Sequence, residues 1–259
     1  MKLRREYKKL IFILPSILGV LTFCLFPLCY CFLFAFSNRA GRFAFGGLVN
    51  YIYLIRSEAF RVAVGNTYFL MLWYIGIEIL VSLGLIYFLD ASRRNLICLV
   101  VFSLPILLPP TLIVKCLTAF SLQPRLALLL IFLWKYTGFH MLVLKAMEMT
   151  MNPEWTDAAV LDQANKWQVF TKIRLPYLWP YLRFLILFDG ICFFRLFRES
   201  YLMYGSYPMD EVYTITNFFF NNFQNLNYQR LSAAAIMALI PLFILNGILL
   251  KVGGQHEMV

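Results

Sequence analysis

Six long apolar runs constrain the fold of this chain more than any other feature of its sequence. They lie at about residues 10–36, 66–90, 96–121, 126–150, 177–203 and 231–251. Each is long enough to cross the hydrocarbon core of a bilayer as a helix, which takes about 20 apolar residues. Barrel strands would be only about ten residues long, with strict alternation. The sequence therefore predicts an all-α integral membrane protein with six transmembrane helices, built as a single transmembrane domain over residues 1–259.

The basic residues indicate which connections lie in the cytoplasm. The net charge of +10 comes largely from Lys and Arg at the ends of the apolar runs, as in KLRREYKK at 2–9 and SRRN at 92–95. This placement follows the positive-inside rule and argues against nucleic-acid binding. It predicts that both termini and the segment 151–176 are cytoplasmic. A cleaved signal peptide is the alternative for the first run, but the 27 residues of that run exceed the about 7–15 of a signal-peptide core.

Motifs for catalysis and metal binding are absent from the sequence. There is no G-x-x-x-x-G-K-[ST], H-E-x-x-H or G-x-S-x-G, so we expect no enzymatic activity and no ATP site in this chain. The six cysteines include no C-x-x-C pair, and neither His140 nor His256 can complete a zinc site with them at a usual spacing. We therefore expect no metal site, and small, buried, reduced cysteines.

A few charged residues fall inside or at the ends of the apolar runs. A charge at membrane depth costs about 2.5–3.5 kcal/mol on insertion scales, so such residues usually face a cavity or each other. For residues near span ends, snorkelling to the interface is a sufficient alternative. For Glu78 and Asp189, positions in a polar cavity and outside one are both open. The candidates for a substrate pathway are Glu78, Asp189, Arg195, Arg198 and Glu199.

The cytoplasmic segment 151–176 is unusually polar for this chain. Asn152 is a good N-cap residue, Pro153 suits the first helical position, and Pro176 is expected to end the segment. Ala158, Ala159 and Ala164 give a helix face with little side-chain bulk, which lets another protein approach closely. A helix lying on the lipid surface is the alternative, because the segment also carries Trp155, Trp167 and Phe170.

The spacing in this segment resembles the cytoplasmic loop of the permease subunits of ABC importers, which reads E-A-A-x-x-x-G, nine residues, then I-x-L-P. Asp157, Ala158 and Ala159 stand at E-A-A, and Gln163 stands at the glycine. Ile173, Leu175 and Pro176 stand at the final three fixed positions. The sugar-importer branch adds D-G-A and Q-x-F, matched here by Asp162-Gln163-Ala164 and Gln168-Val169-Phe170. A left-handed Gln163 would cost about 1–2 kcal/mol, so a reshaped turn is the alternative at that position.

Other stretches extend the resemblance over almost the whole chain. They are FGGLVNYIYLIRSEAF at 45–60, NT at 66–67, LPILLPP at 104–110 and FFNNFQNLNYQRLSAAAI at 219–236. The family is the maltose and glycerol-3-phosphate permease-like group of sugar-type ABC importers, and the resemblance implies its type I importer permease fold. The outer loop between the third and fourth runs is shorter here than in many members.

The resemblance also implies a function and partners. The chain would be the permease subunit of an ATP-driven importer for a sugar or oligosaccharide, in a bacterial cytoplasmic membrane. It would couple an ABC ATPase dimer, which binds the ATP and Mg, to alternating access, so no cofactor is expected in this chain. The other partners would be a second permease, an extracytoplasmic solute-binding protein and membrane lipid. The expected coupling residues are Asp157, Ala158, Ala159, Asp162, Gln163, Ala164, Ile173, Leu175 and Pro176. An importer for a non-sugar solute, such as a glycerophosphate or polyamine, and a non-transport membrane scaffold are the alternatives.

The outer segment 204–228 is rich in aromatic and asparagine residues. Its spacing predicts a helix from about 210 to 224, with phenylalanines buried and with Asn217, Asn221 and Asn225 in a polar stripe that faces the binding protein. An aromatic belt at the membrane surface is the alternative.

Overall fold

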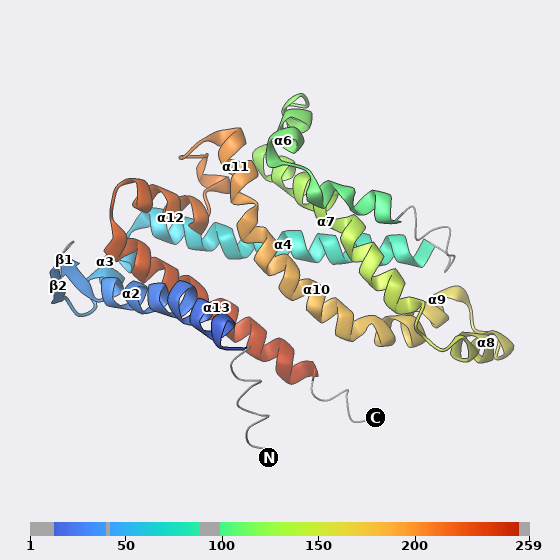
Figure 1. Ribbon diagram of the computed structural model, residues 1–259. Helices are drawn as coiled ribbons and strands as arrows, with labels where there is room; N and C mark the ends of the chain where they lie inside the picture. The colour runs from blue at the N-terminus through green and yellow to red at the C-terminus, as the bar shows by residue number, and fades with distance from the viewer. Residues whose placement is uncertain (1–12, 40–41, 89–98, 254–259) are drawn as a thin grey trace, which may run out of the picture. The chain divides into compact units, whose positions relative to one another are not determined.

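The computed structural model describes residues 13–39, 42–88 and 99–253, and nearly all of them are helical (Figure 1). Two compact units can be distinguished. One comprises residues 1–61 and 218–243, and the other comprises residues 62–217 and 244–259.

The first unit contains the N-terminal helix and a small hairpin. The helix Ile13–Ala35 includes the π-helical turn η1 (Leu21–Leu25) and α2 (Phe26–Ala35). The hairpin pairs β1 (Ser37–Arg39) antiparallel with β2 (Arg42–Phe45), and α3 (Val49–Arg56) follows. The side-chain amide of Asn50 donates to the carbonyls of Ala35 (2.9 Å) and Ser37 (2.8 Å), which ties α3 to the end of α2. This hairpin was not predicted from the sequence.

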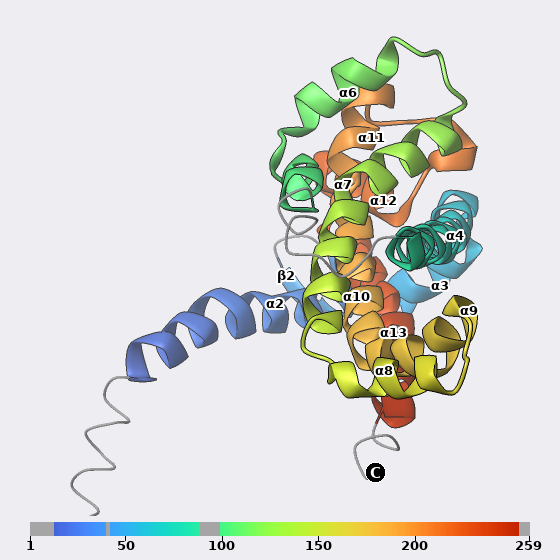
Figure 2. The same cartoon turned by 90° about the vertical axis from the view of Figure 1, so that its right-hand side faces the viewer.

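The second unit is a bundle in which α7 and α10 pack side by side (Figures 1 and 2). A buried core joins these helices to the end of α4 and to η3, and Ile86, Leu144, Phe170, Leu178 and Leu185 are among its members. The remaining elements of the chain, in order, are α4 (Glu58–Phe88), η2 (Leu104–Leu107), α6 (Pro110–Thr118), α7 (Pro124–Glu148), α8 (Pro153–Leu161), α9 (Lys166–Val169), η3 (Phe170–Arg174), α10 (Leu175–Arg195), α11 (Phe197–Tyr204), η4 (Asp210–Val212), α12 (Ile215–Gln224) and α13 (Tyr228–Gly253).

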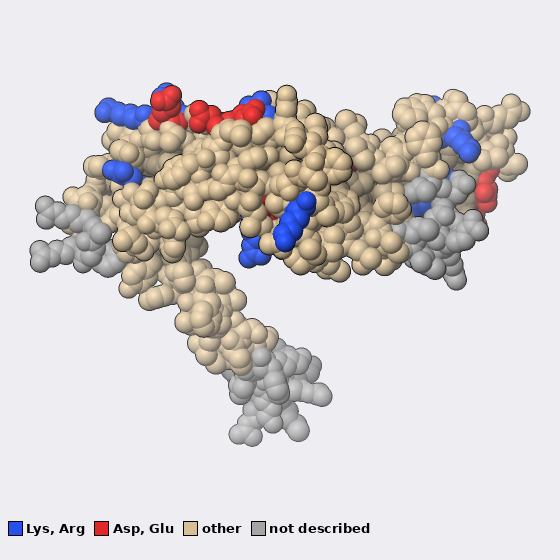
Figure 3. Space-filling model, turned by 90° about the horizontal axis from the view of Figure 1, so that it is seen from above, with Lys and Arg blue, Asp and Glu red and all other residues tan. Residues whose placement is uncertain are grey.

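The described parts of the six predicted spans are largely helical. Among the described residues, Ile13–Ala35, Glu58–Phe88 and Pro124–Glu148 are each long and apolar enough to cross a membrane. The pair Leu99–Leu107 and Pro110–Thr118 gives a fourth if it is counted as one span. The fifth and sixth predicted spans correspond to α10 and α13. The face of the molecule in Figure 3 shows a broad surface with few charged side chains, as expected for contact with lipid.

The third predicted span is sharply broken at its prolines. Leu99–Leu107 and Pro110–Thr118 are bent by 100°. Leu108 and Pro109 are extended between them, with ψ of 139° at both residues. Each of these residues precedes a proline, and the proline ring disfavours helical geometry in the residue before it. The helix can resume only at Pro110, where a missing N–H costs nothing.

Pro176 does not end the cytoplasmic segment, so that expectation was wrong. The chain stays helical from α9 through the π-helical turn η3 into α10, and Pro176 is the second residue of α10. Pro27 follows η1 in the same way. A proline in an ordinary α-helix clashes with the carbonyl four residues earlier. The wider π turn precedes both prolines and gives the ring room.

The cysteines are less buried than expected. Of those described, Cys192 is buried and Cys31 is half-buried, whereas Cys24, Cys29 and Cys116 are exposed on their helices, and all five are free thiols. The expectation of burial was therefore wrong for three of them. A span whose outer surface faces lipid rather than protein exposes apolar side chains of every kind, and small polarizable cysteines suit that surface. Cys98 lies outside the described residues.

Gly138 allows an unusually close approach between two spans. A Cβ atom at Gly138 would lie 2.0 Å from the carbonyl oxygen of Phe102, a backbone atom of the helix 99–107. Small residues are favoured at membrane helix interfaces for this reason. By contrast, a Cβ atom at Gly76 in α4 would meet no heavy atom within 4 Å.

We expect Gly138→Ala to destabilise the folded chain by about 1–3 kcal/mol, the usual cost of overpacking. Gly76→Ala makes the same chemical change in open space and should be neutral or slightly stabilising. Unfolding in mixed detergent micelles compares the two variants directly. Equal stability of the two variants would show that the approach of Phe102 to Gly138 is not as close as described.

Candidate functional site

The segment 151–176 begins with an exposed helix, α8. Asn152 caps it as predicted, because its side-chain oxygen accepts the N–H of Glu154 at 3.0 Å, and Pro153 takes the first position. No residue of α8 is buried. Asp157 and Ala158 are exposed, and the apolar side chain of Leu161 is 84% exposed. A helix with no buried face and an exposed large apolar residue is suited to packing against another protein.

The turn after α8 keeps the left-handed geometry that the family's glycine would supply. Gln163 has φ of 60°. Its N–H donates to the Val160 carbonyl at 3.0 Å, and the Ala164 N–H donates to the Ala159 carbonyl at 2.9 Å. These two bonds form a Schellman motif, the usual end of a helix at a left-handed residue. The alternative of a reshaped turn is therefore excluded, and Gln163 bears the conformational cost.

The second short helix, α9, is held at both ends. Asn165 and Gln168 form a reciprocal capping box, with bonds of 2.8 and 2.9 Å. Trp167 and Phe170 lie edge-on to the ring of Tyr87 near the end of α4, with ring centroids 5.7 and 5.3 Å away. Phe170 is also buried in the core between α7 and α10. The predicted alternative, aromatic residues that rest on lipid, does not describe Phe170.

A groove of about 410 Å³ lies beside α8 and α9. The residues of the coupling segment that line it include Thr156, Val160, Ala164 and Lys166, and the end of α4 contributes Tyr87 and Phe88. Among the other predicted coupling residues, Asp162 and Pro176 are exposed, while Ile173 and Leu175 are half-buried. The structure thus brings the predicted residues onto one continuous helix–turn–helix segment.

One ion pair joins this segment to the end of α7, and a second ion pair within α7 supports it. The carboxylate of Glu148 lies 3.0 Å from Arg174 Nη1 and 2.6 Å from Lys145 Nζ. Glu148 and Lys145 are buried, so losing the Arg174 contact would leave the Glu148 carboxylate less well compensated at low dielectric. Arg174 ends η3, and its ion pair therefore links any movement of α9 to α7.

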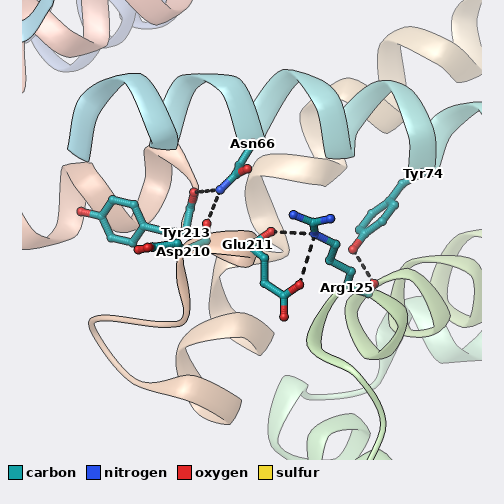
Figure 4. A network of polar contacts seen from close by, with 6 residues as sticks. All are labelled: Asn66, Tyr74, Arg125, Asp210, Glu211 and Tyr213. Atoms are coloured by element: carbon teal, nitrogen blue, oxygen red, sulfur yellow. Dashed lines mark hydrogen bonds and ion pairs between the residues drawn. The ribbon is translucent and has the colours of Figure 1, made fainter. Parts of the chain in front are cut away.

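A polar network at the other end of the bundle holds the outer turn η4 (Figure 4). The Asn66 amide on α4 donates to the carbonyls of Asp210 and Tyr213. Arg125 Nε, at the start of α7, donates to the Glu211 carbonyl at 3.2 Å and lies 3.6 Å from the Glu211 carboxylate. The neighbouring hydroxyl of Tyr74 donates to the Arg125 carbonyl at 2.6 Å. The network explains why Asn and a basic residue occupy these two positions.

The outer helix α12 begins at Ile215 rather than near 210, because residues 210–212 form a 3₁₀ turn. Thr67 Oγ1 accepts the N–H of Ile215 at 2.8 Å, which fixes the start of the helix on α4. Asn217 caps the same start, since its side-chain oxygen accepts the Thr214 N–H at 3.1 Å. Phe218 is buried as predicted, but Phe223 is 56% exposed.

The polar stripe predicted for α12 is mostly not on the surface. Asn217 and Asn221 are buried, and Asn225 alone of the three is exposed. The expectation of an outward stripe was therefore wrong for two residues. Helical spacing identified the shared stripe, but it could not show that the stripe faces inward, where Asn217 serves as a cap.

The charged residues within the spans fall into two groups. Glu78, Asp189 and Glu199 are fully buried. His140 Nε2 lies 2.9 Å from Asp189, His140 Nδ1 lies 3.6 Å from Glu78, and Lys135 Nζ lies 2.6 Å from Glu199. Arg195 and Arg198 are exposed. His140 and Lys135 were not predicted from the sequence to take part in these contacts. The cost of burying three carboxylates is the signal that they need partners.

Comparison with known proteins now identifies the family. Residues 10–252 match the sequence profile of the family described as "binding-protein-dependent transport system inner membrane component". The chain belongs to this family. It is an integral membrane component of a transport system, and the family is one of transport components rather than enzymes.

Relatives and a solved structure support the same assignment. The chain is 26% identical over 281 residues to the arabinooligosaccharides transport system permease protein AraP of Bacillus subtilis, covering 95% of this chain and 88% of the relative. It is 26% identical over 274 residues to the osmoprotective compounds uptake permease protein GgtC of Synechocystis, covering 91% and 96%. A bacterial alginate ABC transporter, solved with an alginate pentasaccharide-bound periplasmic protein, contains a chain that matches with a TM-score of 0.76 at 22% identity, covering 94% and 93%. The fold is thus that of an ABC importer permease of type I.

We expect Gln163→Gly to relieve the left-handed strain, by about 1 kcal/mol or more. Hydrogen exchange at the amides of Gln163 and Ala164, which form the Schellman bonds, should then be about fivefold slower or more. Gln163→Ala removes the same side-chain atoms but keeps a Cβ, so it should give no such protection. Faster exchange in the glycine variant would contradict the assigned strain.

Proposed function

We propose that this chain is the permease subunit of an ATP-driven importer for a sugar or oligosaccharide. The observation that carries the proposal is α8: a helix without a buried residue, bearing Asp157, Ala158 and Ala159 at the spacing of the importer motif. The small Ala158 side chain and the exposed Leu161 would enter a groove on a separate ATPase subunit. That partner would bind ATP and Mg, and this chain would need no cofactor of its own.

The ion pairs of Glu148 support a mechanical link from the ATPase to the spans. Closure of an ATPase dimer would move α8 and α9 as one body, because the Schellman turn and the capping box join them. Arg174, Glu148 and Lys145 would pass this movement to α7. Rigid-body movement of packed helices is an established way to switch a transporter between two states.

The outer end of the bundle would meet the remaining partners. A solute-binding protein would approach the segment held by Asn66 and Arg125, where Asn225 remains an exposed candidate contact. A second, similar permease would complete the pathway. Arg195 and Arg198 are the exposed candidates for the pathway itself, whereas a pathway role for the buried Glu78, Asp189 and Glu199 stays a prediction.

Sugars are favoured over other solutes by the relatives. One relative is named for arabinooligosaccharides, and the structural neighbour belongs to an alginate transporter. The relative named for osmoprotective compounds keeps a small compatible solute as the second candidate. Membership in a family of transport components leaves no support for the non-transport scaffold.

The function is tested by reconstituting the chain with its neighbouring permease, ATPase and binding protein in liposomes. We expect ATP hydrolysis to rise when one member of a panel of neutral oligosaccharides, acidic oligosaccharides and osmolytes is added. Stimulation by an osmolyte alone would favour the second candidate. The absence of any solute-dependent hydrolysis in an assembled complex would contradict import.

The same complex tests the docking of α8. We expect Ala158→Trp to abolish solute-dependent hydrolysis without lowering the amount of chain in the membrane, because an indole does not fit where a methyl group packs. Ala158→Ser changes polarity but little volume and should retain most of the activity. Full activity of the Trp variant would show that the ATPase binds elsewhere.

We also propose that the chain lies in a bacterial cytoplasmic membrane with both termini in the cytoplasm, since Lys and Arg are concentrated on that side. Reporter fusions near residues 50 and 215 should then give an external signal, and fusions at either terminus an internal one. An internal signal at residue 215 would rule out this topology.

A further inference from the structure

Three ionisable side chains meet in the interior of the second unit, one from each of three helices. Glu78 comes from α4, His140 from α7 and Asp189 from α10, and all three are fully buried. His140 Nε2 lies 2.9 Å from Asp189 Oδ1, and His140 Nδ1 lies 3.6 Å from Glu78 Oε1. The other carboxylate oxygen of Glu78 accepts the Thr137 hydroxyl at 3.0 Å. The cluster is separate from the coupling segment and from the outer network.

Both ring nitrogens of His140 face carboxylate oxygens. This arrangement determines how many protons the three side chains hold together. A neutral imidazole has one N–H and one lone pair. If the N–H is donated to Asp189, the lone pair on Nδ1 points at Glu78 Oε1. Neither of these two atoms has a hydrogen-bond partner within the described residues. Two acceptors facing each other in a dry site repel, and two ionised carboxylates beside a neutral ring would bury two uncompensated negative charges.

One added proton removes both problems. On Nδ1 it makes an imidazolium between two carboxylates, and on Oε1 it makes a carboxylic acid that donates to Nδ1. In either form the facing atoms become a donor and an acceptor, and the buried net charge falls from −2 to −1.

We propose that Glu78 and His140 form a buried proton-binding site, which holds one proton between Oε1 and Nδ1 and, through Asp189, keeps α4, α7 and α10 together. This inference goes beyond the proposed function and does not depend on which solute is carried. A polar cluster shared by three spans is well suited to this role, because the hydrophobic effect contributes little to helix association within lipid.

The surrounding ionisable groups interact with partners other than Glu78. Lys135 is engaged with Glu199. Cys192, one turn along α10 from Asp189, interacts with Asp189 and with Tyr136. Arg195 is exposed at the end of α10. Among the described residues, Lys135 is thus paired with Glu199 rather than with Glu78, and Arg195 lies at the surface.

The sign of the pH dependence follows from the proton count. In the unfolded chain Glu and His have ordinary pKa values of about 4.3 and 6.5, so near pH 7.5 neither holds the proton. The folded chain then binds about one more proton than the unfolded chain, and its stability falls as the pH rises. For one proton, the equilibrium constant of unfolding should increase about tenfold per pH unit until the site is emptied.

The test compares unfolding of the full chain in mixed detergent micelles between pH 7.5 and 9.5. Glu78→Gln should remove this tenfold dependence, because the glutamine amide donates to Nδ1 at every pH. Thr137→Val deletes the other hydrogen bond of Glu78 but no titrating group, so it should lower stability and keep the wild-type slope. Identical slopes for the wild type and Glu78→Gln would overturn the proposal.

A second measurement tests for the shared proton directly if the Glu78 variant does not fold. The chain has two histidines, so His256→Gln leaves His140 as the only imidazole. At pH 7.5 its nitrogen NMR spectrum should show two protonated ring nitrogens, or else the infrared spectrum should show a protonated carboxyl group. A neutral ring together with ionised carboxylates only would overturn the proposal.

Discussion

The contact of Glu148 with Arg174 is the interaction on which the proposed coupling most depends. This ion pair joins the segment that carries the exposed helix α8 to α7, which is embedded in the bundle. Its strength comes from burial, because a charge-assisted contact at low dielectric is costly to break. The rings of Trp167 and Phe170 against Tyr87 secure the same segment to α4. A docking helix fixed at only one of these places could move without moving the spans.

The sequence predicted the parts of the fold that depend on chemistry alone. Apolar length predicted helices in all six runs, and among the described residues three of them, or four with the bent pair, are long and apolar enough to cross a membrane. Asn152 and Pro153 marked the start of α8 because their roles at a helix start are local. The coupling residues are likewise read from fixed spacing, and their role stays a prediction. These features need no knowledge of what packs against them.

The features that were missed depend on packing between distant segments. The sequence around His140 does not predict that Glu78 and Asp189 lie on either side of its ring. The burial of Asn217 and Asn221 depends on which way α12 turns, and helical periodicity does not specify that direction. Pro176 was read as a stop because the sequence gives no sign of the π turn that accommodates it. In each case the residue type indicated a polar or conformational role, but the neighbouring sequence did not show which distant residues it contacts.

The π turn η3 also changes how side chains are aligned along the long helical segment from Lys166 to Arg195. A π turn holds about one residue more than an α turn, and one residue corresponds to about 100° around a helix. Side chains before Phe170 and after Arg174 therefore do not belong to a common helical wheel. The side chains of α9 and α10 therefore follow two separate helical wheels, so the exposed face of α9 is set independently of the face that α10 presents to the bundle.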